Sequence, residues 1–362
     1  MNKQSVHINW WLLPISWLYG LVVCIRNKFF KWGILKRETF DVPVICIGNI
    51  TVGGTGKTPH TEYLVRILRD KYRIAVLSRG YGRKTKGFIL ADDKSTSRQI
   101  GDEPLQIKQK FPDIMVAVDA KRTRGIKNLL ALEKPPEVIL LDDAFQHRYV
   151  KPSYTIILTN YNRPAYLDKL LPAGRLRESF GHIYKANMIV VTKCPDDLKP
   201  IDYRLMMHEI NPYPFQSVFF TRFAYKQLVP VFVKKKDTLP LPSLKGMDVL
   251  LVTGIASPAT MIKELQHYTS KIHEMTYPDH YVFKNKDIKK IKERFDAIQS
   301  DNKIIITTEK DATRLVLFDE MDKELKKSLY YLPIEVSFVE NEQLFRDKIL
   351  EHIKAKRISV SL

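Results

Sequence analysis

Residues 44–59 read VICIGNITVGGTGKTP, and this stretch decides the fold of the chain. Residues 44–47 form an apolar run of strand length that leads into a glycine-rich turn. Pro59 follows the turn, where a helix can begin without losing a hydrogen bond that it needs. In such a turn the glycines let backbone N–H groups point inward around phosphates, while Lys57 supplies a positive charge and Thr58 a hydroxyl for Mg²⁺. The stretch therefore predicts a P-loop, the phosphate-binding turn between a strand and a helix.

The residues expected to bind the triphosphate of ATP are those of the loop itself: Thr51, Val52, Gly53, Gly54, Thr55, Gly56, Lys57 and Thr58. The common P-loop pattern begins with Gly, where this chain has Thr51. This departure leaves the mechanism in place, because the strand before the loop and the helix after it are both predicted. A glycine turn that happens to precede a helix is the alternative interpretation.

The spacing of apolar runs predicts a parallel sheet. From residue 42 onward such runs alternate with helical stretches, at residues 44–47, 74–77, 115–118, 138–141, 155–158 and 188–191. This alternation is typical of a parallel sheet with helices on both faces. We expect an α/β fold of the P-loop NTPase type, with its core domain over residues 40–198.

A second α/β domain is expected in the C-terminal part of the chain. Residues 199–241 are polar, contain prolines and carry few helix signals, which indicates a connector. Apolar runs of strand length then resume at residues 249–253, 303–306 and 334–338, separated by helical segments near residues 258–266 and 287–298. Residues 242–362 are therefore predicted to form a second, smaller α/β domain.

The N-terminal segment is the candidate for membrane contact. Residues 8–25 contain no charged side chain, and a basic cluster follows at Arg26, Lys28, Lys31, Lys36 and Arg37. As a helix this segment is slightly shorter than a hydrocarbon core of ~30 Å, so a full span and an interfacial anchor both remain open. A buried helix of a soluble protein is the third interpretation. We predict an N-terminal membrane-associated helix with its basic flank over residues 1–39, and the rest of the chain on the cytoplasmic side.

The charge balance indicates an acidic partner, since 59 Lys+Arg against 40 Asp+Glu give a formal net charge of +19. Phosphates, anionic lipid and nucleic acid would each satisfy it. No stretch interleaves basic and aromatic residues as a nucleic-acid platform does, so no nucleic-acid partner is predicted. Cys24, Cys46 and Cys194 form neither a zinc motif nor a disulfide framework, which fits a reducing cytoplasm.

Two adjacent carboxylates follow a predicted strand. Residues 138–143 read VILLDD, the form of a Walker B strand, so Asp142 and Asp143 are predicted to hold or orient Mg²⁺. A turn or a helix N-cap is the alternative for such a pair. His147 follows at once and would lie near the same sheet edge, although a solvated loop histidine is also open.

Two further segments carry charged side chains that could act on phosphates. Asp102 and Glu103 lie in GDEP, residues 101–104, ahead of a helical segment. Either carboxylate could cap that helix, or it could serve as a catalytic base or Mg²⁺ ligand, because an acceptor hydroxyl needs an oriented proton acceptor. Arg79 lies in the basic glycine-rich loop of residues 78–84, which could grip a phosphate or form an exposed turn.

Taken in order, the motifs of this chain resemble those of the lipid A 4′-kinases, the tetraacyldisaccharide 4′-kinase family. They are TVGGTGKTP (51–59), SRGYGR (78–83), GDEP (101–104), DDAFQH (142–147), LPAGRLRE (171–178), YPDHYVF (277–283) and TEKDA (308–312). The resemblance covers most of the chain, and this family also has Thr at the first P-loop position. It implies transfer of the γ-phosphate of ATP, with Mg²⁺, to the 4′-hydroxyl of a tetraacyldisaccharide 1-phosphate at the cytoplasmic face of the bacterial inner membrane. The implied partners are the lipid disaccharide and the anionic membrane surface, with no obligate protein partner.

The resemblance also implies roles for single residues. Asp102 would be the base that accepts the hydroxyl proton, with His280 as its partner and Lys57 as the catalytic lysine. The residues expected near Mg²⁺ are Thr58, Glu103, Asp142 and Asp143, and further site residues are expected at Arg79, Arg122, His147 and Arg175. Because Asp102 and His280 belong to different predicted domains, we expect closure of the two domains to bring them together.

A different class of protein shares the GGTGKT core, the switch ATPases that partition cargo or mark membranes. Their signature lysine would fall at Val52, and its absence counts against this alternative.

Overall fold

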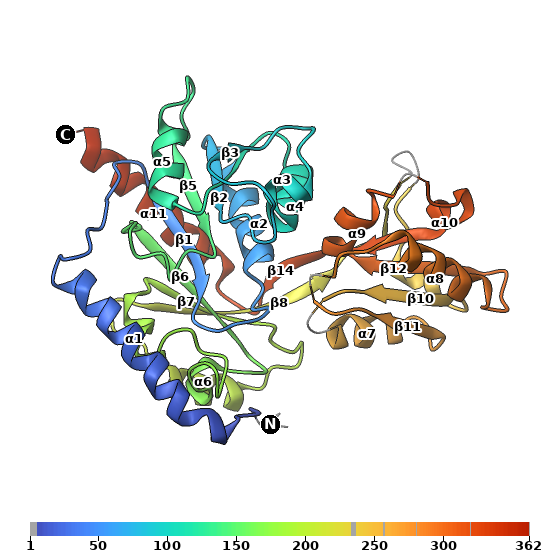
Figure 1. The fold of residues 1–362 in the computed structure, drawn as a ribbon. Coiled ribbons are helices and arrows are strands. Elements are labelled where there is room, and N and C mark those ends of the chain that lie inside the picture. The colour runs from blue at the N-terminus through green and yellow to red at the C-terminus, as the bar shows by residue number, and fades with distance from the viewer. Residues whose placement is uncertain (1–5, 233–236, 256–257, 280, 319, 362) are drawn as a thin grey trace. The chain divides into compact units, whose positions relative to one another are not determined.

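The computed structural model describes residues 6–361, with gaps at 233–236, 256–257, 280 and 319. The chain divides into two compact units (Figure 1). Unit 1 combines Met1–Phe223 with Val336–Leu362, and unit 2 comprises Ala224–Glu335. The predicted division differs from this one, because it assigned the whole chain after residue 241 to the second domain.

Unit 1 is built on a sheet whose nine described strands follow the order β14-β8-β7-β6-β1-β5-β2-β4-β3. Central β1 pairs in parallel with β5 and β6, whereas β3 and β4 form an antiparallel pair at one edge. The predicted α/β fold is therefore confirmed, with a sheet that is mixed rather than purely parallel. The strands are β1 Val44–Asn49, β2 Ile74–Ser78, β3 Ile89–Leu90, β4 Met115–Val118, β5 Val138–Asp142, β6 Tyr154–Asn160, β7 Met188–Thr192, β8 Ser217–Tyr225 and β14 Ile334–Phe338.

Helices cover both faces of this sheet (Figure 1). Successive side chains of a strand point to opposite faces, so Ile45 and Ile47 of β1 join one buried cluster while Val44 and Cys46 join the other. Helices α2, α4 and α11 pack on the first face, and α5 and α6 on the second. The helices of unit 1 are α1 Leu13–Lys31, α2 Lys57–Leu68, α3 Ser97–Ile100, α4 Asp102–Lys110, α5 Arg122–Leu130, α6 Pro200–Ile210 and α11 Glu342–Ser361, with short 3₁₀ turns η1 Trp10–Leu12, η2 Ala165–Leu167 and η3 Phe180–Lys185.

The C-terminal segment returns to unit 1. β14 lies beside β8 in the large sheet, and α11 packs Phe345, Ile349 and Ile353 into the same buried cluster as Ile45. The strand at residues 334–338 was predicted as an element, but its sheet was assigned to the second domain. Pairing partners come from tertiary packing, and nothing in the apolar pattern of a strand names the sheet that it joins.

The predicted connector contains regular structure. Residues 199–241 include α6 and β8, followed by the short strand β9 Val229–Pro230. The prolines of this stretch counted toward the connector prediction, but Pro200 occupies the first turn of α6, where its fixed φ and missing N–H are tolerated. Asn211 ends the same helix in a left-handed conformation, with φ +44°.

Unit 2 contains a five-stranded sheet in the order β11-β10-β12-β13-β9, within the part of the chain that the structure describes. Leu250 and Val252 of β10 face one buried cluster, and Val249 and Leu251 face the other. The remaining strands are β10 Asp248–Thr253, β11 Ile272–Thr276, β12 Lys303–Thr308 and β13 Leu329–Leu332, and the helices are η4 Leu241–Leu244, α7 Ala259–Gln266, α8 Asn285–Asp296, α9 Glu309–Leu315 and α10 Lys323–Ser328. A smaller α/β unit follows the core, as the alternation of strands and helices predicted.

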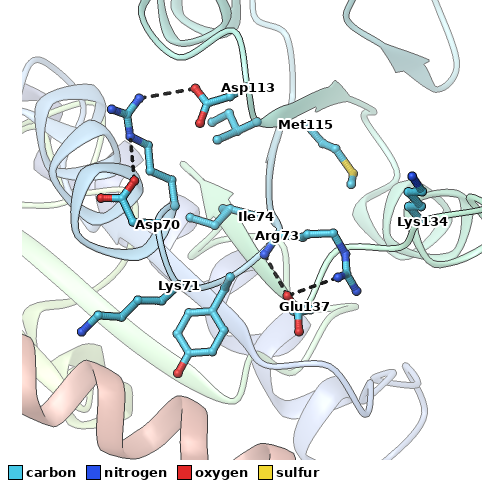
Figure 2. A pocket seen from close by; sticks show the side chains of 11 residues that line it. Asp70, Lys71, Arg73, Ile74, Asp113, Met115, Lys134 and Glu137 are labelled. Atoms are coloured by element: carbon cyan, nitrogen blue, oxygen red, sulfur yellow. Dashed lines mark hydrogen bonds and ion pairs between the residues drawn. The ribbon is translucent and has the colours of Figure 1, made fainter.

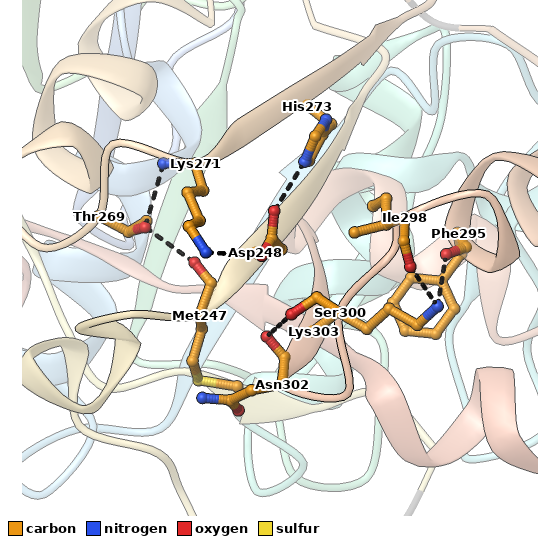
Figure 3. A network of polar contacts seen from close by, with 10 residues as sticks. All are labelled: Met247, Asp248, Thr269, Lys271, His273, Phe295, Ile298, Ser300, Asn302 and Lys303. Atoms are coloured by element: carbon orange, nitrogen blue, oxygen red, sulfur yellow. Dashed lines mark hydrogen bonds and ion pairs between the residues drawn. The ribbon is translucent and has the colours of Figure 1, made fainter.

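A polar network lies at the amino ends of β10 and β12 (Figure 3). Asp248 lies 3.0 Å from Nε2 of His273 and 3.4 Å from the ammonium of Lys271, and the hydrogen bond to His273 does most to hold the pKa of Asp248 below its usual value. Lys303 donates to the carbonyl oxygens of Phe295 and Ile298, both at 2.9 Å. Each of these polar groups has a partner, so we assign the network a role in joining strands to helices.

Helix α1 is anchored along one side and exposed along the other. Ser16 donates to the carbonyl of Leu170 at 3.0 Å, and Tyr19 donates to that of Arg177 at 3.0 Å. The exposed large apolar side chains of this segment are Trp10, Trp11, Ile15, Trp17, Leu18, Leu21, Val22, Ile25, Phe29 and Trp32. Within the described residues, no helix has the length and apolar character that crossing a membrane requires.

Candidate active site

The phosphate loop joins β1 to α2 and owes its shape to glycine. Gly53 and Gly56 have φ of +108° and +87°, a region that other residues rarely adopt. A Cβ atom on Gly56 would lie 2.6 Å from the ring of Phe223, so a side chain there would also clash. These positions explain why the local sequence must contain glycine.

Side chains from β1, from β7 and from the segment after β5 hold the loop in place. Asn49, the last residue of β1, donates to Oγ1 of Thr55 at 2.8 Å, and Gln146 donates to the Asn49 carbonyl at 2.7 Å. Thr192, the last residue of β7, donates to the Thr55 carbonyl at 2.8 Å. The loop is therefore fixed before any nucleotide binds. Asn49, Gln146 and Thr192 were not predicted from the sequence as site residues. Asn49 and Thr192 end largely apolar strands, and Gln146 lies in the quoted motif DDAFQH.

His60 holds the loop from the first turns of α2. Burial lowers its pKa to about 4, so the ring is neutral at physiological pH. Its Nδ1 lies 2.8 Å from the Gly56 carbonyl and its Nε2 lies 3.0 Å from Oγ1 of Thr221. Because a carbonyl only accepts, we assign the proton to Nδ1, and Nε2 then accepts from the hydroxyl.

The two predicted Walker B carboxylates lie beside the loop, at the carboxyl end of β5. Asp142 is fully buried and accepts a hydrogen bond from Thr61 of α2 at 3.1 Å. Burial, followed by the negative charges of Glu103 and Asp143, raises the pKa of Asp142 to about 7. The Lys57 ammonium lies 3.6 Å from Oδ2 of Asp143. The structure therefore brings the P-loop lysine and the predicted metal residues to one place.

These carboxylates fit a magnesium ion that is held partly by phosphate and water. Oδ2 of Asp142 and Oδ1 of Asp143 are buried without a hydrogen-bond partner, which is unfavourable for carboxylates unless a cation offsets it. Across the described chain, no three His, Cys, Asp or Glu side chains are placed to enclose a metal ion by themselves. Mg²⁺ in phosphoryl-transfer sites uses one or two carboxylates together with substrate phosphates and water, so this sparse donor set suits it. Thr58, the other predicted Mg²⁺ residue of the loop, is the second residue of α2.

Asp102 and Glu103 form the first turn of α4. The residue that precedes the helix is Gly101, with φ +93°, so the N-cap position itself carries no side chain. The charge of Glu103 acts on Asp142, which places GDEP near the metal residues. His280 lies outside the described residues, so its pairing with Asp102 stays a prediction.

Arg122 and His147 lie near the same carboxylates. Arg122 is buried at the start of α5, donates to the Asp119 carbonyl at 3.0 Å, and has a pKa that burial lowers to about 10 against the opposing charges of Asp142 and Asp143. Burial, then the charges of Arg122 and Arg79, lowers the pKa of His147 to about 4. The charges of Arg79, Arg122 and His147 therefore interact with one another or with the two carboxylates, which places these three predicted site residues near the same sheet edge.

The LPAGRLRE segment runs alongside the phosphate loop. The Val52 N–H donates to the Arg175 carbonyl and the Arg177 N–H to the Ile50 carbonyl, both at 2.7 Å. The Arg177 guanidinium lies 3.5 Å from Oδ2 of Asp143, on the same oxygen as Lys57. Arg175 was predicted as a site residue, whereas Arg177 was missed, although the quoted motif contained it.

A pocket of about 420 Å³ lies elsewhere in unit 1 (Figure 2). It is lined by Ile74 and Met115, the first residues of β2 and β4, and so lies at the amino ends of strands whose carboxyl ends face the phosphate loop. Arg69 pairs with Asp113 at 3.3 Å at its wall, and Arg73 pairs with Glu137 at 3.6 Å. None of the predicted site residues lines this pocket, so we do not assign catalysis to it.

Comparisons with known proteins bear on the family of this chain. The family model described as tetraacyldisaccharide-1-P 4'-kinase matches residues 8–354. A tetraacyldisaccharide 4'-kinase of Bacteroides thetaiotaomicron is 51% identical over 361 residues, covering 98% of this chain and 94% of the relative. Another, from Porphyromonas gingivalis, is 46% identical and covers 98% of this chain and 100% of the relative. Among solved structures, "apo" form LpxK from Aquifex aeolicus in complex with ATP superposes with a TM-score of 0.73 at 30% identity, over 94% of this chain and 98% of that one.

Proposed function

This chain belongs to the tetraacyldisaccharide-1-phosphate 4′-kinase family, and we propose that it transfers the γ-phosphate of ATP to the 4′-hydroxyl of a tetraacyldisaccharide 1-phosphate in lipid A biosynthesis. The observation that carries the proposal is the preformed phosphate loop, with the Lys57 ammonium 3.6 Å from Asp143. A switch ATPase is not favoured, because the family match extends over residues 8–354 rather than over the loop alone.

Residues of the phosphate loop, the LPAGRLRE segment and the Walker B strand have different roles in phosphoryl transfer. The backbone N–H groups of residues 51–58 surround the β- and γ-phosphates, and Lys57 and Arg177 shift from Asp143 to the transferring phosphoryl group. Asp142, Asp143 and the Thr58 hydroxyl would hold Mg²⁺, with Glu103 nearby. When bound, Mg²⁺ neutralises charge on the phosphoryl oxygens.

Asp102 serves as the base that accepts the proton of the 4′-hydroxyl. It lies beside Glu103 in the first turn of α4, where the helix N-terminus favours a negative charge. A hydroxyl that attacks phosphorus must lose its proton, and a carboxylate within hydrogen-bond reach can accept it. The role of His280 is to orient Asp102, and it rests on the family motif.

The central test is a transfer assay. Purified protein is incubated with Mg²⁺-ATP and a tetraacyldisaccharide 1-phosphate, and mass spectrometry measures the gain of one phosphate. Lys57→Ala is expected to lower kcat at least ~100-fold, because it removes a charge that stabilises the transition state. Lys71→Ala, at the pocket of Figure 2, is the matched control and should retain wild-type turnover. No phosphorylated product from the wild type would refute the function, and normal turnover by Lys57→Ala would refute the role of the loop.

Membrane contact is proposed through the exposed side of α1, as an interfacial anchor. Trp17 is 71% exposed and Leu21 56%, in a segment whose following residues are basic. Apolar side chains inserted beside anionic headgroups, together with nearby cations, bind a helix to the membrane surface. This arrangement would keep the kinase at the cytoplasmic face of the inner membrane, where its lipid substrate lies.

The anchor is best tested by charge substitution, since deletion of α1 would also remove the Ser16 and Tyr19 hydrogen bonds to residues 170–177. Trp17→Glu with Leu21→Glu should release protein from anionic vesicles and raise KM for the lipid several-fold, with KM for ATP unchanged. Phe215→Glu is the control, because this side chain is 62% exposed but lies outside α1. Unchanged vesicle binding and unchanged lipid KM would mean that α1 is structural.

A further inference from the structure

A second lysine points at the phosphate loop. Lys193 follows Thr192, whose hydroxyl bonds to the Thr55 carbonyl, and its backbone takes the left-handed conformation, with φ +58°. Its ammonium lies 3.9 Å from the position that a Cβ atom on Gly54 would occupy. Non-glycine residues adopt this conformation rarely, and such strained positions are found mostly at functional sites. The turn after β7 therefore directs this side chain over the loop.

The Lys193 ammonium lacks a matching negative charge. Burial lowers the pKa of Lys193, and no neighbouring carboxylate opposes that shift in the described part of the chain. Lys57, by comparison, faces Asp143. A cation that is partly removed from water without a counter-charge is unfavourable unless a ligand or an aromatic ring compensates. The Phe223 ring, whose centroid lies 5.9 Å from the ammonium, is one such partner, and a group bound at the loop can be a second.

Phe223 of β8 completes a wall on this side of the loop. Its ring centroid lies 5.9 Å from the Lys193 ammonium, and its ring atoms reach to within 2.6 Å of the Cβ position on Gly56. Phe223 as a whole is partly buried. An aromatic ring next to a lysine stem offers a flat surface for a nucleobase.

The strand order separates this wall from the metal residues. The strands of the sheet lie in the order β8-β7-β6-β1-β5, and the phosphate loop follows β1. On one side of β1, Asp142 ends β5 and Asp143 follows it. On the other side, Lys193 follows β7. The γ-phosphate belongs beside Lys57 and the Walker B carboxylates. The opposite end of the nucleotide is then free to leave the loop toward Lys193 and Phe223.

We propose that Lys193 and Phe223 hold the nucleoside end of ATP, with the purine packed against the Phe223 ring and the Lys193 stem. The ammonium donates to an oxygen of the ribose. This inference rests on the proposed function, because ATP is the nucleotide that the function requires. It makes these two residues determinants of nucleotide affinity, separate from Lys57, which acts on the transferring phosphate.

The test compares two ligands that share a triphosphate and differ in the nucleoside. Dissociation constants are measured for Mg²⁺-ATP and for Mg²⁺-tripolyphosphate, in the full-length wild type and in Lys193→Met and Phe223→Leu. Each variant is expected to weaken ATP binding about 10-fold, the size of one stacking or cation–π contact, with tripolyphosphate binding unchanged. Lys193→Arg should recover most of the ATP affinity, because it restores both a cation and an aliphatic stem.

Equal weakening of both ligands would overturn the proposal, because it would make Lys193 a phosphate ligand or a support of the loop. Wild-type affinity for ATP in both variants would overturn it as well. Lys199→Met is the matched control, an exposed lysine beyond the same strand, and should change neither constant. Phosphorylation of the lipid by the wild type is measured separately, so a failure of this inference is distinguished from a failure of the proposed function.

Discussion

Glu178 is the carboxylate on which the stability of the LPAGRLRE segment should depend. Its side chain is fully buried and accepts a hydrogen bond from Arg148, which is buried as well. The Arg26 guanidinium of α1 lies 3.5 Å away and Nδ1 of His182 lies 3.3 Å away. Burial, then the charge of Arg148, lowers the pKa of Lys185 to about 8, while Glu178 opposes that shift. One carboxylate thus offsets several cations.

Glu178→Gln keeps the shape of the side chain and removes its charge. Breaking a buried ion pair on one side costs about 3–5 kcal/mol, because the remaining charge stays buried without compensation. Gln retains an acceptor for Arg148, so we expect the lower end, a fall of about 3 kcal/mol in the free energy of unfolding of unit 1. Activity should fall together with stability, because this segment bonds to Ile50 and Val52 at the phosphate loop.

Urea denaturation at neutral pH measures this loss by far-UV circular dichroism. The 4 tryptophans all lie in residues 10–32, so their fluorescence reports separately on the α1 region, to which Arg26 belongs. Glu137→Gln is the control, since Glu137 pairs with Arg357 in a partly exposed position where an ion pair contributes ~1 kcal/mol or less. Combining Glu178→Gln with Arg148→Met should cost less than the sum of the single losses. A Glu178→Gln protein within about 1 kcal/mol of wild type would refute the reasoning.

Two further predictions follow from the site. Because burial lowers the pKa of His60 from 6.5 to about 4, its contribution to stability is complete above pH 6.5 and is lost as pH falls toward 4. His60→Gln can keep both hydrogen bonds but does not titrate. Its free energy of unfolding relative to wild type should therefore rise by about 3 kcal/mol between pH 7 and pH 4, measured by paired urea titrations. A difference that stays constant with pH would mean that His60 takes up a proton freely in the folded protein. For the base, Asp102→Ala and His280→Ala should each lower kcat by more than ~100-fold with little change in the Kd for ATP, and the double variant should lose far less than the product of the two. Clean multiplication of the two losses, or an active Asp102→Asn enzyme, would place the base elsewhere.

The sequence by itself determined the phosphate loop, the α/β class and the family. These features are local, because backbone N–H groups close on a phosphate only where glycines permit positive φ, and residues 51–58 show that need directly. The apolar runs indicated the central strands for a similar reason, since a strand buried on both faces is almost wholly apolar. They did not indicate β3, β8, β9, β11 and β13. The Walker B pair was found from its place at the end of such a run.

The tertiary structure decided which distant residues meet at the loop. Thr61 reaches the site from α2, Arg177 from the LPAGRLRE segment and Lys193 from the end of β7. Their spacing along the chain does not predict that they meet there. The return of residues 336–362 to unit 1 was missed for the same reason. Carboxyl ends of parallel strands converge at one sheet edge, but the order of the strands comes from packing between segments far apart in sequence. Local patterns therefore give the elements, and only the completed sheet determines which side chains face the nucleotide.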